Sequence, residues 1–126
     1  MAYDLTMPPI LVVDDDVATL GGLVALLEGA GHAVVAASDF AEGRRLLLSA
    51  RPSLLVVDIR LHEFNGLQLV VIAQSLSPSP PSIVTSGYDD PVLEREARSL
   101  GASFMLKPLD PARLLALVNE RSRLRA

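Results

Sequence analysis

Short apolar runs alternate with stretches of helical spacing along this chain. Two of the runs, Ile10–Val13 and Leu54–Val57, are apolar at every position, which is typical of strands buried on both faces of a parallel sheet. Shorter runs at Ile83–Val84 and Phe104–Leu106 predict two further strands. A weaker run at Ala33–Ala37 predicts a fifth strand that lies near an edge of the sheet.

A stretch with apolar positions three or four residues apart follows each predicted strand, and this spacing indicates an amphipathic helix. Residues that favour helix N-termini mark where these helices begin. The five starting points are Asp16, Asp39, Asn65 or Gly66, Asp90-Pro91 and Asp110-Pro111. Five strand–helix repeats predict an α/β fold, a (βα)5 unit with a parallel sheet and right-handed crossovers. An all-helical bundle is excluded because the apolar runs are too short to be helices.

The composition restricts the chain to one folded domain. Its 126 residues are 50% hydrophobic, which suffices for a single core. No apolar run approaches the roughly 18 residues of a membrane span, and no signal peptide is visible, so we expect a cytoplasmic protein without a membrane partner. The absence of cysteine excludes disulfides and thiolate metal sites, and the net charge of −4 argues against direct nucleic-acid binding. We expect a tail over residues 1–9, the domain over residues 10–120, and the end of the last helix or the start of a linker over residues 121–126.

Polar side chains stand where four of the predicted strands end. The first strand is followed by Asp14 and Asp15, and three others lead into Asp58, Thr85 and Lys107. Adjacent parallel strands lie about 4.8 Å apart and end at the same edge of the sheet, so these side chains must converge. Ligands of open α/β sheets bind outside this edge.

The converging groups predict phosphoryl chemistry with a divalent ion. Carboxylates in one crevice repel one another unless a cation joins them, and an all-oxygen set without histidine or cysteine favours Mg²⁺ or Mn²⁺. Aspartate is a known covalent nucleophile for phosphoryl groups, and Thr85 and Lys107 are suited to stabilise the charge that develops. His32 and His62 stand isolated in the sequence, so neither is predicted to bind metal.

Four motifs in order resemble the receiver domain of bacterial response regulators, and the resemblance covers the chain from Ile10 to Val118. The motifs are Val12-Val13-Asp14-Asp15, Val56-Val57-Asp58, Val84-Thr85-Ser86-Gly87 and Lys107-Pro108. The resemblance implies a doubly wound, flavodoxin-like sheet with strand order 2-1-3-4-5. It also implies that Asp58 is the phosphoacceptor, which takes the phosphoryl group from phosphohistidine on a sensor histidine kinase or a phosphotransfer protein in an Mg²⁺-dependent reaction.

The same resemblance implies a metal site. Asp15 would bind the ion directly, Asp14 mainly through water, and Asp58 and the backbone carbonyl of Arg60 would supply further ligands. The chain departs from the family where Leu61-His62 replaces a common Met-Pro, and this departure puts the contribution of the Arg60 carbonyl in doubt. We also hypothesise that the Arg60 side chain shields or pairs with the phosphoryl group.

The resemblance further implies a switch. Thr85 and Lys107 would contact the phosphoryl group, and the peptide bond between Lys107 and Pro108 would be cis. Phe104 stands where the family has its switch aromatic, and we expect it to favour the inward rotamer because it has no hydroxyl to hydrogen-bond outside. Phosphorylation would then alter the face formed by the fourth helix, the fifth strand and the fifth helix.

The sequence thus predicts a phosphoacceptor switch in a phosphorelay, and not an enzyme with a turnover substrate. Two alternatives stay open: an interaction module that works without phosphorylation, and an Mg²⁺-dependent hydrolase with an aspartyl-phosphate intermediate. The hydrolase is disfavoured because Arg60 stands where such phosphatases carry a second aspartate. The sequence does not identify the downstream effector, and it is compatible with a homodimer through the fourth-helix face. The arginines near the end, Arg121, Arg123 and Arg125, are expected to complement the negative end of the last helix.

Overall fold

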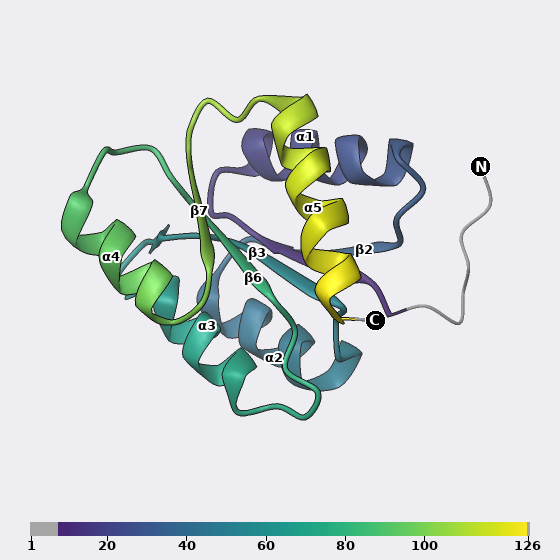
Figure 1. The fold of residues 1–126 in the computed structure, drawn as a ribbon, viewed down its shortest axis with the longest axis horizontal. Coiled ribbons are helices and arrows are strands. Elements are labelled where there is room, and N and C mark those ends of the chain that lie inside the picture. The colour runs from purple at the N-terminus through teal and green to yellow at the C-terminus, as the bar shows by residue number, and fades with distance from the viewer. Residues whose placement is uncertain (1–7, 126) are drawn as a thin grey trace.

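A five-stranded parallel sheet forms the centre of the computed structural model, which describes residues 8–125 (Figure 1). Its order, β2-β1-β3-β6-β7, is 2-1-3-4-5 when the strands of this sheet are counted along the chain, as in a doubly wound flavodoxin-like fold. The strands are β1 (Ile10–Val13), β2 (Val34–Ala37), β3 (Leu54–Asp58), β6 (Ser82–Ser86) and β7 (Ser103–Leu106). The predicted fold class is confirmed, and β2 lies at an edge as expected.

Helices cover both faces of the sheet (Figure 1). One face carries α1 (Val17–Gly29) and α5 (Pro111–Arg125). The opposite face carries α2 (Phe40–Ala50), α3 (Leu67–Gln74) and α4 (Pro91–Ser99). Because the central strands are buried on both sides, their residues alternate between two cores.

The strand β1 shows how the sheet separates these two cores. Leu11 and Val13 belong to the cluster on the α2–α3–α4 side, whereas Ile10 and Val12 belong to the cluster on the α1–α5 side. All four are at most 2% exposed, which explains why this run has no polar position. Burying each such side chain contributes about 1.5–3 kcal/mol, and the sheet is thereby a rigid support for the residues at its edge.

Aspartates cap four of the helices at the predicted places. Asp16 accepts hydrogen bonds from the backbone N–H groups of Ala18 and Thr19, at 3.0 and 3.4 Å. The bond from Thr19 is the main reason why the pKa of Asp16 lies below its ordinary value. Asp39, Asp90 and Asp110 cap the helices that follow them in the same way.

A small antiparallel hairpin follows β3, and sequence analysis did not predict it. It consists of β4 (Arg60–Leu61) and β5 (Phe64–Asn65). His62 opens its two-residue turn with φ +57°, a conformation that proline cannot adopt because its ring holds φ near −65°. At the position where the family commonly has proline, the backbone of His62 therefore has a conformation that a proline would not allow. Phe64 stacks on Phe40 with ring centroids 4.5 Å apart, which attaches the hairpin to α2.

The ends of the chain differ in part from the sequence-based expectations. Most of the predicted tail, residues 1–7, lies outside the described residues. The helix α5 runs through residues 121–125. Arg121 was predicted to complement the end of its own helix, but it contacts another segment, and the side chains of Arg123 and Arg125 lie outside the described residues. The Nη2 of Arg121 donates to the carbonyl of Gly101, 2.7 Å away, just beyond α4. None of the described helices is long and apolar enough to span a membrane.

Candidate functional site

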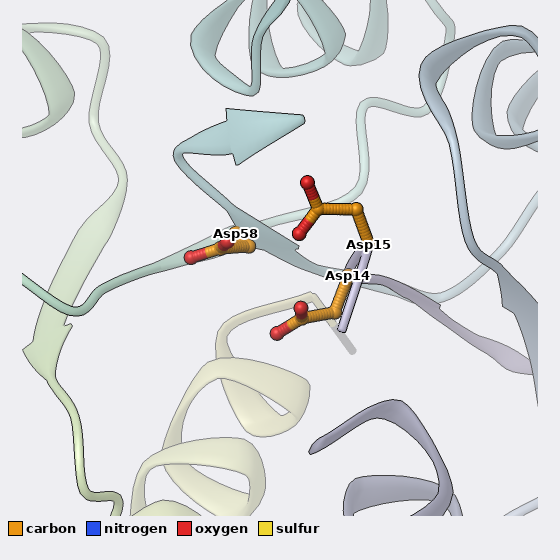
Figure 2. A group of neighbouring side chains, drawn as sticks. All are labelled: Asp14, Asp15 and Asp58. Carbon is orange, nitrogen blue, oxygen red and sulfur yellow. The ribbon is translucent and has the colours of Figure 1, made fainter. Parts of the chain in front are cut away.

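Three carboxylates meet at the carboxyl edge of the sheet (Figure 2). Asp14 and Asp15 follow β1, and Asp58 is the last residue of β3. These strands are neighbours, with Val13 paired to Val57, so the residues that come next lie side by side. One carboxylate oxygen from each aspartate lies within 4.8 Å of the other two. Asp14 and Asp58 are buried at 1% and 7% exposure.

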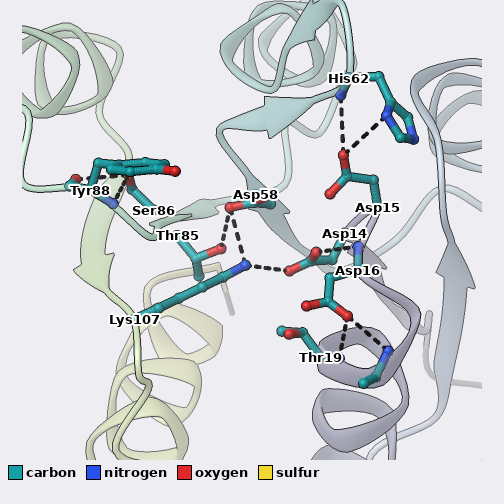
Figure 3. A network of polar contacts seen from close by, with 11 residues as sticks. Asp14, Asp15, Asp16, Thr19, Asp58, His62, Thr85, Ser86, Tyr88 and Lys107 are labelled. Carbon is teal, nitrogen blue, oxygen red and sulfur yellow. Dashed lines mark hydrogen bonds and ion pairs between the residues drawn. The ribbon is translucent and has the colours of Figure 1, made fainter.

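Lys107 connects two of these carboxylates from the other side (Figure 3). Its ammonium donates a hydrogen bond to Asp14 Oδ2 at 2.9 Å and lies 3.4 Å from Asp58 Oδ1. Burial alone would lower the pKa of Lys107, but the hydrogen bond to Asp14 and the charge of Asp58 outweigh it, so the pKa is raised. Lys107 is therefore a permanent cation beside Asp58. The peptide bond that joins it to Pro108 is cis.

Thr85 lies directly opposite Asp58 in the sheet. The two residues are register partners on β6 and β3, and the Thr85 hydroxyl donates to Asp58 Oδ1 at 3.5 Å. Thr85 is 1% exposed, so its hydroxyl belongs to the wall of the site. Parallel pairing brings these residues together although 27 positions separate them in the chain.

The site has more negative charge than Lys107 can neutralise. Burial and the charge of Asp14 raise the pKa of Asp58 to about 6, although Lys107 opposes this rise. The carboxylates of Asp14, Asp15 and Asp58 repel one another unless a further cation lies between them. Carboxylate oxygens are the ligands that hard ions such as Mg²⁺ prefer, so the donor set fits such an ion.

Two contacts around this cluster were missed by sequence analysis. His62 is isolated in the sequence, but the fold brings it to Asp15: its backbone N–H donates to Asp15 Oδ2 at 3.2 Å and its Nδ1 lies 3.6 Å from the same oxygen. That His62 does not bind metal stays a prediction. The Arg60 guanidinium lies over the ring of Tyr88, 4.6 Å from its centroid. No sequence motif links His62 with Asp15 or Arg60 with Tyr88. The role of the Arg60 carbonyl as a metal ligand stays a prediction.

Phe104 is buried at 9% exposure and packs in the core cluster on the α4 side. It is the register partner of Val84, the residue before Thr85. A cavity of about 240 Å³ lies beyond it, lined among others by Phe104, Glu94 and Arg113, which come from β7, α4 and α5. Phe104 thus lies between the core on the α4 side and a cavity at the α4–β7–α5 face, and its switch role stays a prediction.

Comparison with known proteins identifies the family of this chain. Residues 10–119 match the model of the response regulator receiver domain. The chain belongs to the receiver domain family of response regulators. The receiver domain protein (CheY-like) of Methanospirillum hungatei JF-1 has the same fold with a TM-score of 0.88 and 29% identity, over 94% of this chain and 96% of that one.

Curated relatives of this receiver domain are regulatory proteins. One is the transcriptional regulatory protein GlrR of Escherichia coli K12, 32% identical over 88% of the chain and 25% of its own length. Another is the acid tolerance regulatory protein ActR of Rhizobium meliloti, 33% identical over 89% of the chain and 58% of its own length. The chain thus spans between about a quarter and somewhat over half of the length of these relatives. It is a receiver domain of a two-component response regulator, a class of phosphoacceptor switches and not of classical enzymes.

Proposed function

We propose that Asp58 of this receiver domain is the phosphoacceptor of a phosphorelay. The observation that carries the proposal is the convergence of Asp14, Asp15 and Asp58 around one position, with Lys107 and Thr85 touching the same Asp58 oxygen. Support also comes from a response regulator of Burkholderia pseudomallei, which is 29% identical and has a TM-score of 0.80. It was solved with a phosphorylated aspartic acid and a calcium ion.

In the proposed reaction an Asp58 carboxylate oxygen attacks phosphorus of a phosphohistidine. The new P–O bond forms as the P–N bond breaks, and the imidazole leaves with the bonding electron pair and is then protonated. Lys107 and the Thr85 hydroxyl lie where they would bind phosphoryl oxygens, which disperses the charge of the transition state. Hydrolysis of the acyl phosphate by water, which regenerates Asp58, is part of the proposal.

Asp14, Asp15 and Asp58 would hold the Mg²⁺ ion that such a reaction uses, or Mn²⁺ in its place. The ion would supply positive charge for the phosphoryl oxygens and reduce the repulsion among the carboxylates. This chain's own contribution is a set of oxygen ligands, two of them buried, that adjacent strands bring together. The Arg60 carbonyl is proposed as a further ligand.

Thr85 and Phe104 would carry the signal away from Asp58. When a phosphoryl group takes the Thr85 hydroxyl as a donor, Thr85 moves toward it and space opens beside the ring of Phe104, one register position along β7. Phosphorylation would thereby change the relative populations of two conformations that differ in the position of the ring and in the shape of the α4–β7–α5 face. A downstream effector, or a second copy of the domain, would recognise this face.

The test is incubation with acetyl phosphate and Mg²⁺, followed by mass spectrometry of the intact and the digested protein. We expect one phosphate per molecule, located on Asp58, and none in Asp58→Asn. Asp39→Asn is the control, since Asp39 is an exposed helix cap that does not belong to the carboxylate cluster. An unmodified wild-type protein would support the interaction module instead, and sustained turnover of phosphate esters would support the hydrolase. The kinase or phosphotransfer partner and the cytoplasmic location remain predictions.

A further inference from the structure

Arg60 and Tyr88 form a pair beside Asp58 and Thr85. Arg60 opens β4 two residues after Asp58, and Tyr88 follows β6 three residues after Thr85. The Arg60 guanidinium lies 4.6 Å from the centroid of the Tyr88 ring. The pair therefore joins the two loops that leave the site from neighbouring strands.

The backbone of Tyr88 is fixed by Ser86 (Figure 3). The Ser86 hydroxyl donates to the Tyr88 carbonyl at 2.9 Å and accepts the Tyr88 N–H at 3.1 Å. Ser86 itself is 1% exposed and belongs to β6, so this anchor is part of the rigid sheet. Tyr88 is 62% exposed, so its position comes from this anchor and not from burial in a core.

Arg60 has no ion pair among the described residues. This holds although Lys107 alone does not neutralise the carboxylates of the site. Two residues of extended chain span about 7 Å, so an arginine at this place is long enough to reach toward Asp58. Its guanidinium instead lies on the aromatic face of Tyr88. A cation–π contact at an exposed site changes an equilibrium by only about two- to fivefold, so the ring holds Arg60 weakly.

We propose that Tyr88 is a positioning residue for Arg60. It determines the fraction of time for which the Arg60 guanidinium contacts the phosphoryl group. The proposal rests on phosphorylation of Asp58. A phosphoryl group carries nearly two negative charges and accepts bidentate hydrogen bonds from arginine, which are stronger than the contact with the ring. The guanidinium is then shared between the ring and the phosphoryl oxygens. Removing the ring increases the share on the phosphoryl group, where Arg60 shields it from water.

The resting contact is tested first, by NMR of the unphosphorylated domain. The side-chain protons of Arg60 lie over the ring, so we expect upfield ring-current shifts in the wild type and in Tyr88→Phe, and their loss in Tyr88→Leu. Beryllofluoride with Mg²⁺, a phosphoryl mimic, should reduce the shifts in the wild type. Wild-type Arg60 shifts that equal those of Tyr88→Leu would overturn the proposal, and this measurement does not depend on phosphorylation.

The second test measures dephosphorylation after removal of the phosphodonor. We expect Arg60→Ala to lose the phosphoryl group faster than the wild type, Tyr88→Leu to lose it about two- to fivefold more slowly, and Tyr88→Phe to match the wild type. In the Arg60→Ala background, Tyr88→Leu should have no further effect. An equal effect of Tyr88→Leu in both backgrounds, or no effect in either, would refute the positioning role while leaving Asp58 as phosphoacceptor. Failure of every variant and of the wild type to be phosphorylated would refute the proposed function instead.

Discussion

Gly66 lies against the backbone of Asp58 so closely that a β-carbon on Gly66 would overlap the Asp58 carbonyl oxygen. Gly66 is the N-cap of α3, and its N–H donates to the Ile59 carbonyl at 2.7 Å. Its φ of −57° is open to any residue, so the glycine is required by this close approach and not by its backbone conformation. The start of α3 thus determines where the end of β3, and with it the carboxylate of Asp58, lies.

This contact predicts the effect of Gly66→Ala. The added methyl must displace the Asp58 backbone, so we expect a loss of about 1–3 kcal/mol in the free energy of unfolding and slower phosphorylation. Gly21→Ala is the matched control, since nothing lies within 4 Å of a β-carbon at this position in α1. It should stabilise the domain by up to about 1 kcal/mol through helix propensity. Chemical denaturation and acetyl phosphate kinetics measure both effects, and a Gly66→Ala protein as stable and reactive as the wild type would contradict the steric argument.

The carboxylate cluster predicts that Mg²⁺ stabilises the folded domain. A ligand that binds only the folded state raises the melting temperature in proportion to the logarithm of its concentration above Kd. Asp15→Ala should abolish this dependence, because it removes one of the three ligands. Asp16→Ala is the informative control: it removes the helix cap and so lowers the melting temperature, yet it should leave the Mg²⁺ dependence intact. Calorimetry or circular dichroism follows the transition, as the chain has no tryptophan. A melting temperature that Mg²⁺ does not change in the wild type would count against the metal site.

The sheet and the convergence of its polar ends followed from the sequence because both depend on regular spacing. Uninterrupted apolar runs indicate buried strands, and parallel strands end at one edge, so Asp58 and Thr85 were expected at the same edge of the sheet. The strand order that makes them direct neighbours was implied by the family resemblance. The aspartate caps were equally predictable, since a short polar side chain before an amphipathic stretch has few other roles.

Features that depend on irregular backbone could not be predicted from the sequence. The two-residue strands β4 and β5 are too short for any periodicity, and nothing in the sequence announces the positive φ of His62. The contact of His62 with Asp15 spans 47 positions and is made partly through a backbone N–H, which carries no residue-specific signal. The contact of Arg121 with Gly101 was missed for a related reason: a long side chain reaches a neighbouring helix end as readily as its own.

The raised pKa of Asp58 predicts a pH dependence of stability in the absence of divalent ions. In the folded protein this pKa is about 6, above its ordinary value of 3.8, so the folded state holds the proton more tightly than the unfolded chain. The contribution of Asp58 to stability is therefore fully present below about pH 4 and is lost as the pH rises through 6, by up to about 3 kcal/mol. Asp58→Asn removes this loss.

We accordingly expect Asp58→Asn to be more stable than the wild type at pH 7.5 in EDTA and nearly equal to it at pH 4, as measured by urea denaturation at each pH. Adding Mg²⁺ at pH 7.5 should reduce the difference, because the ion stabilises the ionised carboxylate of the wild type. A stability difference that is the same at both pH values would show that Asp58 ionises as readily in the folded state as in the unfolded chain.

The burial of Phe104 predicts the resting state of the switch. An outward rotation would expose apolar surface at about 25 cal/mol per Å² with no hydroxyl to hydrogen-bond with water, so the inward rotamer dominates before phosphorylation. NOEs between the ring and the methyl groups of Val84, its register partner in the same cluster, should be strong in the free domain. Phe104→Tyr adds a hydroxyl that favours the outward position and should weaken these NOEs, whereas Phe104→Leu should destabilise the domain because the smaller side chain leaves a cavity. A Phe104 ring that gives no NOE to Val84 in the free protein would mean that the α4–β7–α5 face is already rearranged at rest.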